Sequence, residues 1–320
     1  MLTKLCAFDV AAFGLVIAEI VRRARTTQPT CASRTHHPTP PPSAASYWRV
    51  LERGHYIPVE VCPAPLTTSL VQAMQRCLDA PDLPLAEIHK LRKILVQKMR
   101  DDWNTAKEAE ASATSKAKLA QMMRKIAVYT GPNFKDHLRA SVLASSHYPT
   151  FLALARQLIH DHLLPHLADQ LGERSFAVQR QPSMRFNLPG SSALGARKED
   201  TDEAIGMHTD GQYGHQPGEM NFLLSLTDIF DTNGLFVESE PELGDFAEVK
   251  MGAGAIFAFA GVSRRHYNKR NATGAARVSI DFRIIPMSMY DDGHKAARAG
   301  EVGVHAHRFT LESYFELVSV

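Results

Sequence analysis

The sequence lacks long apolar runs and paired cysteines. Its longest uncharged apolar stretch near the start, residues 10–18, is far shorter than the roughly 20 residues that span a bilayer, so we expect no membrane span. The four cysteines all lie in the first quarter and form no CxxC pair, which excludes a zinc-finger spacing and indicates free thiols in a reducing compartment. We therefore expect an intracellular protein.

Net charge is also scarce. The chain has 36 Lys and Arg against 34 Asp and Glu, and residues 1–50 carry +4, which leaves −2 for the other 270 residues. A protein that binds nucleic acid needs a basic patch in its folded part, so we expect no nucleic acid among the partners. Hydrophobic residues at 44% and charged residues at 22% are typical of a globular protein.

Residues 1–46 differ in composition from the rest. Phe13, Val16 and Ile20 have the spacing of one helix face, and residues 26–46 contain five prolines and one charged residue, which is typical of a linker. The first segment is either a packed helix or a targeting segment, and in the second case the protein is organellar and not cytoplasmic. The folded body is expected to begin near Tyr47.

The body changes character near residue 174. Residues 47–174 have helical spacing, as in Ile88 and Leu91 after a cap at Asp82, and a later helix is expected from Pro149 to Gly172 with a kink at Pro165. Residues 175–290 consist of short β-like runs separated by turn sequences, namely 176–181, 184–188, 220–226, 235–238, 255–259 and 277–285. This pattern predicts an α+β domain with a sandwich or barrel, followed by a C-terminal extension over residues 291–320.

One histidine and one carboxylate stand two residues apart in the β half, at His208 and Asp210. Residues two apart on a strand share a face, so both side chains can reach one metal ion. With 15 histidines in the chain, such an HxD pair is expected about once by chance. The pair is informative only together with a third ligand.

A second pattern supplies that ligand. Ten residues separate His266 from Arg277, and the turn at residues 271–274 predicts a hairpin that brings the two together. Arg277 shares a strand face with Ser279, so this polar face is expected to line a cavity. Two histidines and one carboxylate leave open positions on iron(II), while an arginine fork and a hydroxyl suit a carboxylate such as that of 2-oxoglutarate.

HxD, a distant histidine and RxS together resemble the iron(II)/2-oxoglutarate-dependent dioxygenases. The stretch HTDGQYGHQPGEMNFLLSLTDIFDTNGLFVESEPELGDF is similar to the streptomycin-biosynthesis dioxygenase-like proteins, relatives of the phytanoyl-CoA hydroxylase branch, and the resemblance covers residues 178–286. It implies a double-stranded β-helix, or jelly roll, buttressed by the N-terminal helices. It also implies dioxygen as a co-substrate and ascorbate as a helpful addition in vitro.

The resemblance assigns roles to particular residues. It implies iron on His208, Asp210 and His266, and the distal carboxylate of 2-oxoglutarate on Arg277 and Ser279. Asn221 is expected to contact the co-substrate or the substrate. The further substrate residues are predicted to be Arg185, Tyr213, Tyr267 and Arg283. Ser225 replaces a frequent proline, and Tyr267 replaces a small residue after the distal ligand, so the substrate of relatives is not carried over.

Several alternatives remain open. Basic residues near the strand ends either face the pocket, which favours a carboxylate-bearing small molecule such as a kainoid-type amino acid, or form a solvated rim. The reaction is expected to be hydroxylation or oxidative cyclisation at an unactivated C–H bond. A phytanoyl-type lipid or acyl-CoA hydroxylase is the second hypothesis, and a catalytically silent binding module is the third. The histidines at 160, 162, 166 and 215 are interpreted as structural, and the sequence does not determine the oligomeric state.

Overall fold

The structure is a computed structural model. It describes residues 44–109, 121–124, 126, 133–192, 201, 204–294 and 309–320. The helix and most of the linker expected over residues 1–46 lie outside these ranges, so those expectations remain predictions. Residues from Pro42 to Val320 form one compact unit. Within the described part of the chain, no helix combines the length and hydropathy that a transmembrane span requires.

Helices dominate the first half, as the sequence predicts. They are α2 (Ala44–Glu52), α3 (Ala64–Cys77), α4 (Leu91–Ala109), α6 (Phe134–Ala144), α7 (Tyr148–Gln157) and α8 (Leu164–Leu171), with 3-10 turns η1 (Val59–Val61) and η2 (Leu85–Lys90). A π-helical turn, η3 (Leu158–Leu163), joins α7 to α8 directly before Pro165, and α8 ends at Gly172 with φ 68°. The long helix and its irregularity before Pro165 are confirmed. The cap expected at Asp82 is wrong, because the 3-10 turn begins after Pro84.

The larger sheet has seven antiparallel strands. Its order is β1-β8-β5-β10-β2-β11, and β3 also pairs with β10. These strands are β1 (His55–Tyr56), β2 (Ser175–Gln179), β3 (Ser183–Asn187), β5 (Met220–Ser225), β8 (Ile256–Phe259), β10 (Arg277–Pro286) and β11 (Phe315–Ser319). Strand β10 is long enough to pair with β3 along its first half and with β2 along its last three residues.

The smaller sheet has four strands in the order β4-β9-β6-β7. These strands are β4 (Ile205–His208), β6 (Leu235–Val237), β7 (Ala247–Val249) and β9 (His266–Asn268). The expected hairpin between His266 and Arg277 is wrong, because β9 belongs to this sheet whereas β10 belongs to the larger one. The turn at residues 271–274 therefore carries the chain from one sheet to the other.

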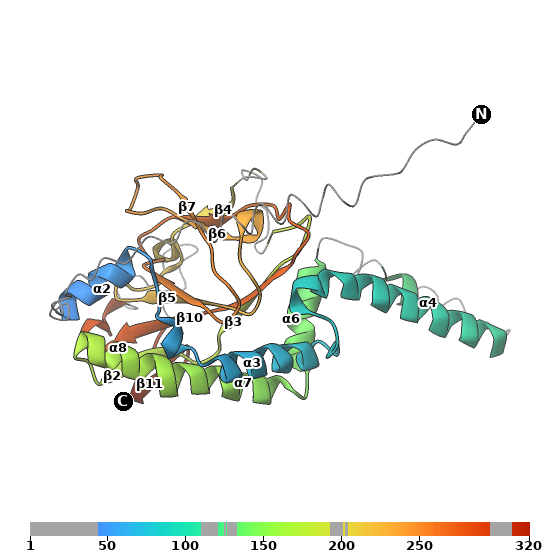
Figure 1. Cartoon of the computed structure of the whole chain (residues 1–320), viewed down its shortest axis with the longest axis horizontal. Coiled ribbons are helices and arrows are strands. Elements are labelled where there is room, and N and C mark those ends of the chain that lie inside the picture. The colour runs from blue at the N-terminus through green and yellow to red at the C-terminus, as the bar shows by residue number, and fades with distance from the viewer. Residues whose placement is uncertain are drawn as a thin grey trace, which may run out of the picture. The chain divides into compact units, whose positions relative to one another are not determined.

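Side chains of β10 alternate between two environments. Val278, Ile280, Phe282 and Ile284 are fully buried in the main hydrophobic core, which includes residues of α3, α7 and α8. These helices cover the outer face of the larger sheet, whereas α4 projects from the body (Figure 1). Phe257 and Phe259 of the larger sheet pack with Leu235 and Val237 of the smaller one in a second core. The mixture of helices and antiparallel sheets is confirmed.

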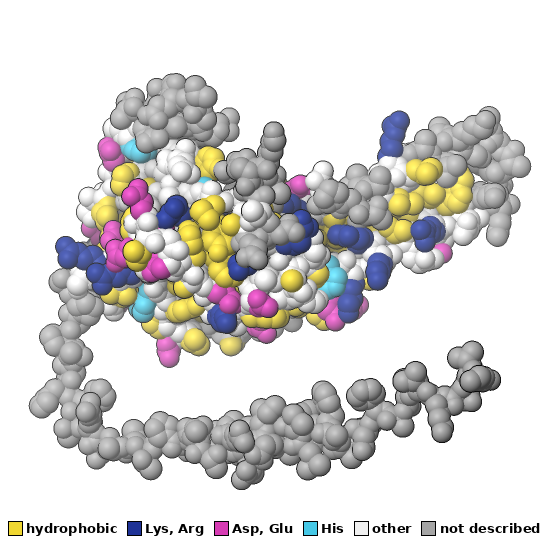
Figure 2. Space-filling model, turned by 90° about the horizontal axis from the view of Figure 1, so that it is seen from above, with side chains coloured by type: hydrophobic (Ala, Val, Ile, Leu, Met, Phe, Trp, Pro, Cys, Tyr) yellow, Lys and Arg dark blue, Asp and Glu magenta, His cyan; other side chains and the backbone are white. Residues whose placement is uncertain are grey.

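The outer surface is mixed in charge. On the face in Figure 2, basic side chains and acidic side chains of described residues lie interspersed over the body. Charged groups of both signs scattered in this way keep a surface hydrated without creating a strong field of one sign. A separate group of charged residues lines a pocket between the two sheets.

Candidate metal centre

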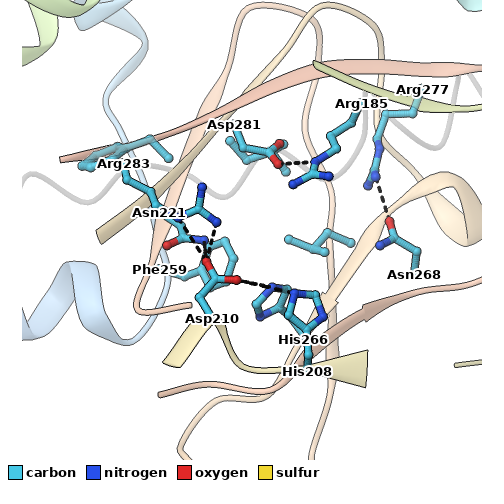
Figure 3. Close-up of a pocket in the computed structure, with 13 residues that line it drawn as sticks. Arg185, His208, Asp210, Asn221, Phe259, His266, Asn268, Arg277, Asp281 and Arg283 are labelled. Atoms are coloured by element: carbon cyan, nitrogen blue, oxygen red, sulfur yellow. Dashed lines mark hydrogen bonds and ion pairs between the residues drawn. The ribbon is translucent and has the colours of Figure 1, made fainter. Parts of the chain in front are cut away.

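A polar pocket lies between the two sheets, beside their shared apolar core (Figure 3). Its polar lining comes from β3, β4, β5, β9 and β10 and from the start of the 3-10 turn η4 (Asp210–Tyr213). The lining residues are Arg185, His208, Asp210, Asn221, Phe222, Leu223, Leu235, Phe259, His266, Asn268, Arg277, Asp281 and Arg283. The alternation of β10 brings its polar face into this space, as predicted from the sequence.

Three predicted metal ligands converge at one end of the pocket. His208 ends β4 and His266 begins β9, and these two residues are directly paired across the strands. The Nε2 atom of His208 lies 3.4 Å from Oδ1 of Asp210, and Nε2 of His266 lies 3.7 Å from the same oxygen. The three ligand atoms all lie within 4.8 Å of one another. This donor set suits a divalent transition metal with open coordination positions.

Backbone carbonyls orient both imidazoles. Nδ1 of His208 donates to the carbonyl of Gly206 at 2.5 Å, and Nδ1 of His266 donates to that of Arg264 at 3.0 Å. With the proton on Nδ1, each Nε2 lone pair faces the site, as a metal ligand requires. Burial lowers the pKa of His266 to about 4, which keeps this ring neutral at physiological pH.

The two oxygens of Asp210 have different partners. Oδ1 faces the histidines, whereas Oδ2 accepts hydrogen bonds from Arg283 Nη2 at 2.6 Å and from Asn221 Nδ2 at 2.7 Å. Burial on its own would raise the pKa of Asp210, but Arg283 holds the pKa of this carboxyl well below its usual range, with help from both histidines. The carboxylate is thus ionised and offers one oxygen to a metal.

Arg283 also belongs to a second set of contacts behind the metal site. Its Nη1 donates to the hydroxyl of Tyr314 at 3.0 Å, and its Nε lies 3.7 Å from Oε2 of Glu219. The same Glu219 oxygen accepts a bond from Nδ1 of His215 at 2.5 Å, and the His215 ring stacks on Phe309 at 3.7 Å. Arg283 is expected from the sequence to contact substrate; it lines the pocket and pairs with the predicted metal ligand Asp210, and its substrate role remains a prediction.

Arg277 lies at the other end of the pocket, and Ser279 lies two residues farther along β10. Arg277 is 2% exposed, and the only hydrogen bond of its guanidinium among the described residues runs from Nη2 to Oδ1 of Asn268 at 2.7 Å. Its Nε and Nη1 atoms and the fully buried Oγ of Ser279 have no partner within the described part of the chain. Burial lowers the pKa of Arg277 to about 10, so the group is still cationic at neutral pH.

Orphaned buried donors are costly unless a ligand satisfies them. A guanidinium fork and a hydroxyl side by side match the geometry of a carboxylate. The donor set of Arg277 and Ser279 therefore fits a carboxylate group of a bound molecule. Oδ1 of Asn221 is also buried without a partner among the described residues, and Asn221 lies beside Asp210 and Arg283 (Figure 3).

The remaining predicted substrate residues lie in different places. Arg185 lines the pocket, and its Nε donates to Oδ2 of Asp281 at 2.5 Å. The Tyr213 ring packs against His208 with 5.3 Å between centroids. Tyr267 is not among the lining residues and stacks on Phe236 at 5.2 Å. These roles remain predictions.

Most of the other basic residues near the strand ends are already engaged. Arg265 binds the Glu238 carboxylate at 2.8 Å, and Arg264 donates to the carbonyl of the same residue at 3.0 Å. Lys269 lies 4.7 Å from the Phe236 ring centroid, and Arg270 donates to the Gly190 carbonyl at 2.9 Å. None of these four basic residues is among the lining residues of the pocket. Among the arginines that line the pocket, Arg185 and Arg277 therefore keep donor nitrogens that make no hydrogen bond with described residues.

The histidines interpreted as structural have structural contacts. His166 lies 2.8 Å from the Tyr47 hydroxyl, and His160 lies 3.8 Å from Glu316. Among the described residues, His208, Asp210 and His266 are the group that can hold a metal ion.

This chain is similar to known proteins in part of its sequence. No family model matches the chain. The streptomycin biosynthesis protein StrG of Streptomyces griseus is 33% identical over 114 residues, which are 36% of this chain and 49% of StrG. The chain thus matches about half the length of that curated relative.

Solved structures with some likeness are more distant. The non-heme monooxygenase ThoJ, as a nickel complex, has 14% identity and a TM-score of 0.40 over 76% of this chain and 77% of its own. A 2OG-Fe(II) oxygenase family oxidoreductase from Burkholderia pseudomallei has 18% identity and a TM-score of 0.33 over 44% and 59%. The epimerase SnoN with Fe3+ and alpha ketoglutarate has 14% identity and a TM-score of 0.29 over 42% and 59%. By the match to StrG, the predicted resemblance to the streptomycin-biosynthesis proteins is confirmed.

Proposed function

We propose that this chain is an iron(II)/2-oxoglutarate-dependent oxygenase that oxidises an unactivated C–H bond of a small, carboxylate-bearing specialised metabolite. One observation carries the proposal. Arg277, whose buried donors have no partner among the described residues, lines the same pocket as the converging ligands His208, Asp210 and His266, and the unpartnered Ser279 hydroxyl lies two residues farther along β10. A metal site next to a carboxylate site is what a chelating 2-oxo acid requires.

Strand order supports a double-stranded β-helix for residues 183–286. Going along the chain, β3, β5, β8 and β10 belong to the larger sheet, whereas β4, β6, β7 and β9 belong to the smaller one. The chain therefore passes repeatedly between two facing antiparallel sheets, as in a jelly roll. The helices of residues 47–174 buttress the larger sheet, and β11 extends it, which favours one oxygenase domain that includes the C-terminal extension.

Each site residue has a distinct role in this proposal. His208, Asp210 and His266 hold iron(II) through two imidazole nitrogens and one carboxylate oxygen, and the buried Arg277 and Ser279 bind the distal carboxylate of 2-oxoglutarate. Asn221 fixes Asp210 through its amide nitrogen and offers its free Oδ1 to a bound molecule. Iron(II) with 2-oxoglutarate and dioxygen supplies an oxidant for C–H bonds, and the protein positions the carbon that reacts.

The pocket lining favours a small polar substrate over a lipid. Of the thirteen lining residues, Phe222, Leu223, Leu235 and Phe259 are apolar, and they belong to the packed cores rather than to a long apolar chamber. An amino acid of the kainoid type suits such a lining better than an acyl-CoA does.

Succinate formation tests the proposal. Purified protein with iron(II), ascorbate, dioxygen and 2-oxoglutarate is expected to form succinate, and His266→Ala is expected to form none because one of three metal ligands is lost. His147→Ala serves as the matched control, since His147 is exposed and distant in sequence from the pocket. Equal succinate formation by the wild type and His266→Ala contradicts the proposal. If the wild type binds neither iron nor 2-oxoglutarate, the hypothesis of a catalytically silent binding module replaces the proposed oxygenase function.

A further inference from the structure

A second hollow adjoins the pocket at the turn between β2 and β3. This groove has a volume of about 650 Å3 and is formed by residues 179–185, by α6 and the start of α7, and by Ser313 and Tyr314 near the C-terminus. Such a volume is within the range of sites that hold small metabolites. Arg185 lines both the groove and the pocket, so the two spaces share a wall.

Three arginines line this groove, namely Arg139, Arg180 and Arg185, and no acidic residue is among its described lining residues. Each guanidinium is fixed through its Nε atom. Arg139 Nε donates to the Met184 carbonyl at 3.3 Å, and Arg180 Nε donates to the Phe315 carbonyl at 3.1 Å. Arg185 Nε donates to Asp281, as described above.

Anchoring through Nε leaves the terminal nitrogens for other partners. The Nη atoms of Arg180 and Arg185 make no hydrogen bond with described residues, and Arg139 Nη1 contacts only the exposed Asp136 at 3.2 Å. A guanidinium that is held in place loses little side-chain entropy when it binds an anion. The three groups thus form a preorganised cationic wall.

The groove also touches the metal centre through a single layer of side chains. Gln179 and Tyr314 line the groove, and both accept hydrogen bonds from Nη1 of Arg283, whose Nη2 holds Asp210. A molecule in the groove therefore lies next to the residues that fix the metal ligand Asp210. Leu143 and Tyr148 add an apolar side to the same groove.

We infer that this groove anchors the anionic group, carboxylate or phosphate, of a small substrate whose reacting carbon enters the pocket past Arg185. Its use as a substrate site rests on the proposed function, whereas anion binding by the groove does not. The substrate class is then a metabolite with an anionic group remote from the oxidised carbon. This anion is separate from the 2-oxoglutarate carboxylate assigned to Arg277.

Isothermal titration calorimetry of the metal-free full chain tests the inference, with citrate and pyrophosphate as separate probes. We expect at least one probe to bind, and we expect Arg180→Gln and Arg139→Gln each to weaken its binding about tenfold, because charge-assisted hydrogen bonds are lost. Arg76→Gln removes an equivalent charge from an exposed position of α3 outside the groove and is expected to leave binding unchanged. The preferred probe identifies the anion as carboxylate or phosphate.

Three outcomes overturn the inference. They are no binding of either probe, equal weakening by Arg76→Gln, and binding that is lost in Arg277→Ala but retained in both groove variants. Arg180→Gln decides the matter if Arg139→Gln unfolds, because Arg180 is exposed. Because the titration uses neither iron nor turnover, intact probe binding without succinate formation contradicts the proposed function and leaves the groove as an anion site.

Discussion

Arg283 Nη2 and Nε lie 2.6 Å and 3.2 Å from Oδ2 of Asp210, so two donors of one guanidinium hold one oxygen of the carboxylate. The other oxygen, Oδ1, is left facing His208 and His266. Because β10 carries the arginine and the turn after β4 carries the aspartate, this contact ties the two sheets together at the metal centre. It also fixes the orientation of the carboxylate before any metal arrives.

Replacing Arg283 by Met is expected to weaken metal binding 10- to 100-fold, the usual effect of removing a partner that orients a ligand. The measurement is the dissociation constant of cobalt(II), followed by its visible absorption in the wild type and the variant. Tyr314→Phe, which removes one contact to Arg283 but leaves the contact to Asp210, is expected to have a smaller effect. Equal cobalt affinity in all three proteins would show that Asp210 needs no partner.

Arg277→Ala is expected to weaken 2-oxoglutarate binding by a factor of ten to a hundred, the value of charge-assisted hydrogen bonds in a dry site. Its effect on cobalt(II) affinity is expected to be small, because Arg277 lies at the opposite end of the pocket from the ligands (Figure 3). Ser279→Ala, with one hydroxyl lost, should fall between the wild type and Arg277→Ala. Parallel losses of metal and 2-oxoglutarate binding would instead indicate general unfolding.

The buried His266 predicts how stability depends on pH. Its pKa is about 4 in the folded metal-free protein, whereas an unfolded histidine titrates near 6.5, so below that pH the unfolded state binds more protons. From about pH 7.5 to about pH 5, this group is expected to lower the free energy of unfolding by about 2 kcal/mol. Urea unfolding at both values checks this. His266→Gln should show a correspondingly smaller pH dependence, and an unchanged dependence would refute the assignment.

Glu238 is expected to matter for stability rather than for chemistry. This carboxylate is 1% exposed and accepts bonds from the backbone nitrogen of Arg265 at 2.6 Å and from its guanidinium at 2.8 Å, which fixes the residue before His266. Glu238→Gln removes the charge and is expected to lower the free energy of unfolding by about 1–3 kcal/mol. Glu240→Gln is the control, because Glu240 is exposed and lies 3.7 Å from Arg53. Similar unfolding curves for both variants would contradict this role.

The sequence predicted what depends on short-range spacing. Two-residue alternation placed Arg277 and Ser279 on one face of β10, and the same alternation places Tyr267 on the face opposite His266. Strands such as β4 and β9 contain only four and three residues, too few for a periodic pattern, so they were not predicted as elements.

Contacts between residues that are far apart in the chain could not be predicted from the sequence. Arg283 lies on the same face of β10 as Arg277, but its partner Asp210 lies 73 residues away. The Tyr314 hydroxyl can accept a bond from Arg283 because β11, which directly follows Tyr314, pairs with β2 at the edge of the larger sheet. Glu219 binds His215 and lies 3.7 Å from Arg283. Such pairings follow from the three-dimensional path of the chain.

The alternation along β10 also limits how this protein can evolve. Every second residue of β10 packs in the core that the helices cover, and the residues between them include the arginines that line the pocket. An insertion or deletion of one residue would turn the core residues toward the pocket and the pocket residues toward the core. Arginine side chains would then enter the apolar core while isoleucines replaced the anion-binding groups. New substrates are therefore expected to arise by changes that leave the length of β10 unaltered.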